Sequence, residues 1–303
     1  MNDFLDQLKG EINLDALQDQ TVAKAGYEYK IPDKGATLAR FVGYIELGKH
    51  PEFFNGKEKE HPAPYAKLVF ELLGAKHITT DEDGNKRSTM YYQDVTIKTD
   101  EKAKFRKLFM KMRGGREDVK HMAQMLGEGF IIKIVHNTVG EGKDQKTYAN
   151  IYDSGEWLVF PPVKEDPLSG EVEVIEVPPM MATPQLFLFD NPTKTQWDSI
   201  FIDGEYTTKD DKGNETTRSK NFIQRRIMEA KNFEGSAVED MLSGLGELDL
   251  TDDTDASEPE KQEDKPEDKP KEPVKEEPKE EVKEPAKTEA DVDDVFAELG
   301  IHV

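Results

Sequence analysis

The chain has 303 residues, with 63 acidic against 41 basic side chains, which gives a formal net charge of −22. It contains no cysteine, which excludes disulfide frameworks, cysteine-zinc sites and thiol catalysis, and fits a reducing cytoplasm. Taken over the whole chain, this acidity argues against nucleic acid as a partner, because phosphate binding normally requires an excess of Lys and Arg.

Residues 1–30 are predicted to form a weak amphipathic arm, with Phe4, Leu5, Leu8 and Ile12 at helix-like spacing. No basic stretch followed by a long apolar run opens the chain, so we expect no secretory signal. The longest apolar runs are strand-sized, so we expect no membrane-spanning segment and no membrane partner.

Residues 31–162 carry the clearest secondary-structure signals. Apolar and polar residues alternate between turn residues, which predicts strands at 37–47, 65–73, 87–98, 129–138, 146–152 and 157–160. After the third strand, Thr99-Asp100-Glu101 predicts the capped start of a helix. Its buried stripe is formed by Phe105, Leu108, Phe109 and Met112, and a second helical piece is expected at 119–126.

Three strands, a helix and two strands is the element order of an OB-fold, a five-stranded Greek-key barrel with its helix between the third and fourth strands. We therefore predict a mainly β protein with α insertions and an OB-like barrel over residues 31–162. An ordinary α+β sandwich with the same element order is the alternative.

Residues 163–246 are predicted to be an extension or lid of the barrel. A hairpin turn is expected at 210–214, between two strand-like stretches. Ser219 is expected to cap a basic helix that runs through Ile223 and Ile227.

Strand alternation places Ala39, Phe41, Ile45 and Leu47 of the first strand inside the barrel. The opposite face then carries tyrosines among cations, the combination with which single-stranded nucleic acid is bound by base stacking and phosphate contacts. Taken singly, each tyrosine also fits an ordinary half-buried sheet residue. The outward candidates are Arg40, Tyr44, Tyr65, Lys67, Tyr92, Lys98, Lys133, Tyr148 and Tyr152.

The stretch 98–120 has nine basic residues against four acidic ones, which is unusual in a chain of this charge. We expect it to lie beside the barrel face and to contribute to the same DNA-binding surface. A solvated helix face is the ordinary alternative. The further candidates from this stretch are Lys102, Lys104, Arg106, Lys107, Lys111, Arg113 and Arg116.

The charge is segregated along the chain. Residues 246–303 hold 22 acidic and 8 basic residues, a net of −14, whereas residues 31–162 hold 19 and 21, a net of +2. Residues 247–290 are a Glu/Lys/Pro linker with almost no apolar side chain, which is typical of a disordered segment. A purely solubilising tail is the simplest role for it.

The last residues, 291–303, become apolar again. Val292, Val295, Phe296 and Leu299 fall on one face of a short helix, beside Asp293 and Asp294. The same pattern of nine positions occurs at 238–246, where it could simply end a helix. We expect the second copy to be a tip that binds a partner protein through these six residues.

The sequence contains no motif typical of an enzyme: GxxxxGK[ST], HExxH and GxSxG are absent. The six histidines are scattered, without the spacing of metal ligands. We therefore expect no catalytic residue, no bound metal and no cofactor. Two alternatives remain open: a protein-interaction scaffold, and a metal-dependent nuclease built from some of the 63 carboxylates.

Four parts of the sequence resemble the single-stranded-DNA-binding proteins of bacteria and, more closely, of tailed bacteriophages. These parts are the opening strands at 38–48 and 67–72, the string Gly155-Glu156-Trp157 and the acidic tip. The resemblance implies a non-enzymatic protein that coats single-stranded DNA in replication, recombination and repair. It also implies that the tip recruits replication or recombination proteins, in the host cytoplasm if the chain is phage-encoded.

Overall fold

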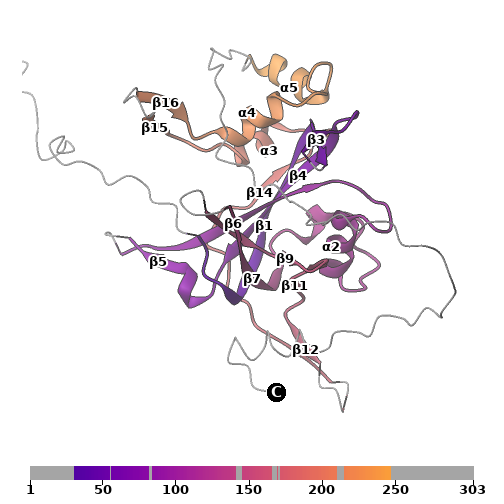
Figure 1. Cartoon of the computed structure of the whole chain (residues 1–303), viewed down its shortest axis with the longest axis vertical. Coiled ribbons are helices and arrows are strands. Elements are labelled where there is room, and N and C mark those ends of the chain that lie inside the picture. Colours follow the sequence, from indigo (N-terminus) through magenta and orange to yellow (C-terminus); the bar gives the residue numbers. More distant parts are fainter. Residues whose placement is uncertain are drawn as a thin grey trace, which may run out of the picture. The chain divides into compact units, whose positions relative to one another are not determined.

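A computed structural model describes residues 31–54, 56–81, 84–140, 145–165, 169, 171–209 and 215–246 (Figure 1). The contacts separate Met1–Ile31 from Pro32–Val303, and all described residues except Ile31 belong to the second unit. The expected N-terminal arm, linker and tip therefore lie outside the described residues.

The fold is mainly β. The strands are β1 (Gly35–His50), β2 (Phe53–Phe54), β3 (Lys57–Glu58), β4 (Ala63–Leu72), β5 (Ile78–Thr80), β6 (Lys86–Thr96), β7 (Gly129–Val139), β8 (Lys146–Asn150), β9 (Tyr152–Asp153), β10 (Glu156–Trp157), β11 (Val159–Phe160), β12 (Val163–Glu165), β13 (Val172–Val174), β14 (Gln185–Phe187), β15 (Glu205–Lys209) and β16 (Glu215–Ser219). The helices are the short 3-10 helices η2 (Ala75–His77) and η3 (Met122–Met125), and α2 (Lys104–Arg113), α3 (Lys194–Ser199), α4 (Phe222–Met228) and α5 (Ala237–Leu245).

One curled antiparallel half-barrel sheet organises the molecule, with the strand order β11-β7-β1-β4-β6-β5. β8 adds to β7 by antiparallel pairing, and β14 runs parallel to β1. The strands predicted between residues 31 and 162 are all present, and β15 and β16 pair as the predicted hairpin. Figure 1 shows β1, β4, β6 and β7 crossing the centre of the molecule.

Closing this sheet into a full barrel would require β6 to pair with β8. No such pairing occurs among the described residues. The two strands are linked instead by the Tyr91 hydroxyl, which donates to the Ala149 carbonyl at 3.3 Å. The architecture is therefore a half-barrel, and the Greek-key closure of an OB-fold goes beyond it.

β1 departs from strict alternation, because its pairing with β4 shifts between Phe41 and Gly43. A bulge of one residue turns the following side chains to the other face of a sheet. Phe41 packs on Phe70 with ring centroids 5.2 Å apart, as expected for the inner face. Ile45 and Leu47, which were predicted to share that face, lie on the opposite one, and that prediction was wrong.

A second hydrophobic core, which we call the cap core, covers the outer face of the sheet. Residues far along the chain bring side chains from β14, α3, α4 and α5 onto β1 and β4. Its buried members are Val42, Ile45, Leu47, Val69, Phe187, Phe189, Trp197, Ile200, Ile223, Ile227, Ala230, Val238 and Leu242. The elements β14, α3, α4 and α5 thus pack on the sheet through the cap core.

The helix after the third strand begins later than predicted. α2 starts at Lys104 with Ala103 as an uncapped N-cap, and its first turn has no acidic residue. Asp100 is used in a turn, where its carbonyl accepts the Ala103 N–H at 2.9 Å. The second helical piece shortens to η3, which His121 and Gln124 stabilise as a capping box.

Candidate nucleic-acid interface

Three predicted residues meet on the outer face of β4 and β6, where α4 approaches the sheet. The Lys67 ammonium pairs with Asp94 at 2.6 Å, and Arg226 of α4 pairs with the same carboxylate at 2.5 Å. Lys67 lies 5.9 Å from the Tyr92 ring centroid, and Arg226 lies 5.9 Å from that of Tyr65. We call Tyr65, Lys67, Tyr92, Asp94 and Arg226 the sheet-face cluster.

The charges of this cluster are largely satisfied within it. Burial raises the pKa of Asp94, but Lys67 and Arg226 outweigh that effect and hold it below its ordinary value. Lys67 is only 8% exposed, whereas Tyr92 is 41% exposed. Tyr92 is therefore the most exposed member of the cluster, and Lys67 lies against its ring.

Lys98 lies beyond β6 and is held by a carboxylate from the loop before β2. Its ammonium contacts both Glu52 oxygens at 2.8 Å, and Lys59 reaches the same group at 3.0 Å. Burial raises the pKa of Glu52, yet the two lysines lower it overall. Lys98 is thus a paired cation rather than the free phosphate contact that was predicted.

A second group of predicted residues gathers at α2. The Lys104 ammonium lies 4.3 Å from the centre of the Tyr152 ring, and that ring packs edge-on against Trp157 at 4.9 Å. The Trp157 indole N–H donates to the Lys104 carbonyl at 2.8 Å, which fixes the start of α2 against β10. We call Lys102, Lys104, Arg106, Lys107 and Tyr152 the helix cluster.

Three cations of the helix cluster have no acceptor among the residues that the structure describes. Within the described ranges, the side chains of Lys102, Arg106 and Lys107 make no hydrogen bond or ion pair. Lys102 and Lys107 are exposed, and Arg106 is half-buried. Cations that have no partner in the described ranges are available to phosphate groups without breaking an existing interaction.

The remaining basic residues of this stretch are engaged locally. Lys111 donates to the Trp157 carbonyl and lies over the Phe160 ring at 4.2 Å, while Arg113 donates to the Arg116 carbonyl. Arg116 forms a two-pronged pair with Glu128 at 2.8 Å, which raises its pKa. These three predicted contacts hold the end of α2 in place.

Tyr44 and Arg40 do not form part of an open face, so their predicted role as exposed contacts is not supported. Tyr44 is 1% exposed, and burial, followed by the nearby Glu46 charge, raises its pKa. Its ring packs edge-on against His121 at 5.2 Å. Arg40 donates to the backbone carbonyls of Gly127, Val177 and Pro178 at 2.6–2.7 Å.

The other two predicted strand residues lie apart from both clusters. Lys133 is half-buried on β7, where its backbone N–H donates to the Leu158 carbonyl at 2.9 Å. Tyr148 is half-buried on β8, opposite Asn137 of β7. The single predicted surface therefore separates into a sheet-face cluster and a helix cluster, with Lys133 and Tyr148 outside both.

Sequence reasoning missed Arg226 and the residues that tie the chain from 177 to 189 to the sheet. Glu71 is fully buried and accepts the Met181 and Ala182 N–H groups at 3.1 Å. Glu46 accepts the Phe189 N–H at 2.9 Å. The basic composition of the α4 region signalled Arg226, but no local pattern marks an acidic strand residue as a backbone anchor.

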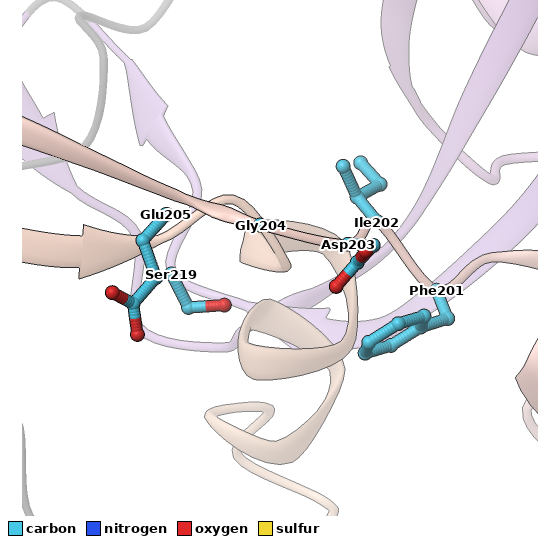
Figure 2. A pocket seen from close by; sticks show the side chains of 6 residues that line it. All are labelled: Phe201, Ile202, Asp203, Gly204, Glu205 and Ser219. Atoms are coloured by element: carbon cyan, nitrogen blue, oxygen red, sulfur yellow. The ribbon is translucent and has the colours of Figure 1, made fainter. Parts of the chain in front are cut away.

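A pocket of about 450 Å³ is lined by residues 201–205, which lead from α3 into β15, and by Ser219 at the end of β16. Figure 2 shows its lining, with Phe201, Ile202 and Asp203 along the segment before β15 and Ser219 near Glu205. Its carboxylates, Asp203 and Glu205, are unsuited to a phosphate backbone. Over the described residues, no group of three or more His, Asp or Glu could hold a metal ion.

None of the helices that the structure describes is long and apolar enough to cross a membrane. The partner-binding residues predicted at 292–299 lie outside the described part of the chain. Comparison with protein-family models, with curated proteins and with solved structures finds no match for this chain.

Proposed function

We propose that the chain is a non-enzymatic single-stranded-DNA-binding protein. The observation that carries the proposal is the helix cluster, in which Lys102, Arg106 and Lys107 have no partner in the described ranges and are close in sequence to Lys104, whose ammonium contacts the Tyr152 ring. Phosphates would contact the free cations, and bases would stack on Tyr152 and on the exposed ring of Tyr92.

We also propose that the half-barrel is a variant of the OB-fold. Strands β1, β4, β6, β7 and β8 follow the strand order of that fold, with α2 between the third and the fourth. Ligands of such barrels bind across the second and third strands. Here these strands are β4 and β6, which carry Tyr65, Lys67 and Tyr92.

We further infer that the acidic C-terminal residues occupy the helix cluster only while DNA is absent. The C-terminal residues 246–303 carry a net charge of −14 and would compete with DNA for the helix cluster at low salt. We further propose that the tip at 291–303 recruits replication or recombination proteins when DNA displaces it. Removal of 251–303 should then tighten DNA binding, and unchanged affinity at low salt would contradict this competition.

The decisive experiment is a titration of a dye-labelled oligo-dT with the full chain, followed by fluorescence anisotropy at low and at moderate salt. Binding at low salt that weakens steeply with added salt is expected, because displaced counterions contribute to affinity. No binding at low salt would overturn the proposal and leave the interaction scaffold.

A stacking variant sharpens the test. Tyr92→Ala should weaken oligo-dT binding by roughly 5-fold to 150-fold, since a base–aromatic stack contributes about 1–3 kcal/mol. Tyr206→Ala on β15 is the matched control, because Tyr206 belongs to the hairpin outside both clusters. Equal losses for the two variants would argue against a stacking surface on β6.

A further inference from the structure

The structure of the first copy of the nine-residue pattern indicates what the second copy, in the tip, can bind. Residues 238–246 form most of α5, which Ser236 caps at its start by accepting the Glu239 N–H at 3.3 Å. Val238 and Leu242 are 0% and 1% exposed and belong to the cap core. The helix ends at Gly246, whose φ of +69° is the left-handed conformation that favours glycine.

The sequence of the tip matches that of α5 position by position. Val292, Val295, Phe296 and Leu299 correspond to Val238, Met241, Leu242 and Leu245, and Gly300 corresponds to the C-terminal glycine. Acidic residues occupy the two positions after the first valine in both copies. The repeat therefore includes the two buried anchors, the partly buried flank and the residue that terminates the helix.

The first copy also shows what such a helix needs in order to be stable. An isolated helix of this length is marginal in water, so α5 depends on the apolar surface beneath it. We define the α5 seat as the members of the cap core contributed by α4 and by the second residue after it, namely Ile223, Ile227 and Ala230. Figure 1 shows α5 beside α4 at the end of the described chain.

We propose that the tip of the same chain is an alternative occupant of the α5 seat, which it binds as a helix when α5 leaves. The linker of about 45 residues gives a typical reach of roughly 40 Å, so it spans the distance back to the seat. Val292 and Phe296 would replace Val238 and Leu242. Because α5 is joined to α4 by a much shorter segment, α5 is the main occupant and the tip the minor one.

The test is a double-mutant cycle in the full chain, in which the stability of each variant is measured by urea unfolding. Leu242→Ala weakens α5, and Phe296→Asp disables the tip. Phe296→Asp alone should leave the unfolded fraction within about twofold of the parent. In the Leu242→Ala background it should raise that fraction about fivefold or more, because the tip can no longer replace the weakened helix.

The matched control is Leu68→Ala, which removes the same atoms from a fully buried residue on the inner face of β4. Phe296→Asp should have no larger effect in that background than in the parent. Equal effects in the Leu68→Ala and Leu242→Ala chains would overturn the proposal. A non-additive effect that grows with protein concentration would also overturn it, because the tip would then act on another copy.

A direct measurement uses the absence of cysteine from the sequence. A nitroxide attached through Glu298→Cys in the Leu242→Ala chain should broaden the methyl resonances of Ile223 and Ile227. It should leave those of Ile134 and Ile151 sharp, since these residues lie outside the cap core. No broadening at α4 would refute the docking of the tip, and neither measurement depends on DNA binding.

Discussion

Three unpaired cations of the helix cluster permit a quantitative prediction about salt. Replacing Lys102, Arg106 and Lys107 together by glutamine removes three positive charges without breaking any ion pair among the described residues. Each phosphate contact on a single strand contributes about 0.7 to the slope of log affinity against log salt, so the triple variant should flatten that slope by about 2.

The size of this change makes it easy to measure. Between about 50 and about 200 mM salt, the parent should lose roughly 20-fold more affinity for oligo-dT than the triple variant. Fluorescence anisotropy at four or five salt concentrations gives the slope directly. Circular dichroism of the variant should match the parent, because these side chains have no structural partner in the described ranges.

The control variant loses the same charge elsewhere. Lys34, Lys76 and Lys86 are exposed and lie before β1, in η2 and at the start of β6. Their replacement by glutamine should shift the affinity slightly through net charge but leave the slope near that of the parent. If both triple variants flatten the slope equally, the helix cluster is not a phosphate-binding surface.

Three further predictions concern stability, each measured by urea unfolding. Glu71→Ala should cost about 1–3 kcal/mol, because it leaves the part-buried N–H groups of Met181 and Ala182 without their acceptor. Gly48→Ala should cost more than about 1 kcal/mol, since Gly48 has a φ of +80° and a Cβ would lie 2.5 Å from the Phe189 ring. Asp94→Asn should destabilise at neutral pH, and its deficit should shrink as the pH falls below 3.8, because the lowered pKa of Asp94 stabilises the fold only while the carboxylate is ionised. A deficit that stays constant down to strongly acidic pH would contradict the ion-pair account of the sheet-face cluster.

The strands of the half-barrel could be predicted from the sequence, because β4, β6 and β7 keep a regular alternation of side chains. The exposure of single residues in β1 could not be predicted. The bulge at Phe41–Gly43 cannot be recognised from the pattern of apolar and polar residues. It moves Ile45 to the outer face, while Tyr44 stays buried. Periodicity identifies which residues share a face only as long as the register is unbroken.

The ion-pair partners of the basic residues in the candidate site could not be predicted from the sequence either. The sequence indicates that 98–120 is basic, but not that Glu52 and Glu128 neutralise Lys98 and Arg116 from other parts of the chain. Arg226 joined the cluster only because α4 folds back onto β6 from 132 residues away. Such long-range partners depend on tertiary packing, which local patterns do not encode.

The cap core has a consequence for the synthesis of the protein. Val42 emerges from the ribosome about 200 residues before Leu242, which completes the cover over it. At about 5–20 residues per second, the apolar outer side of β1 stays uncovered for roughly 10–40 s. A nascent chain in this interval is a target for chaperones, and a fragment that ends at residue 162 would keep that surface permanently and aggregate. The buried members that cover this surface extend as far along the chain as Leu242.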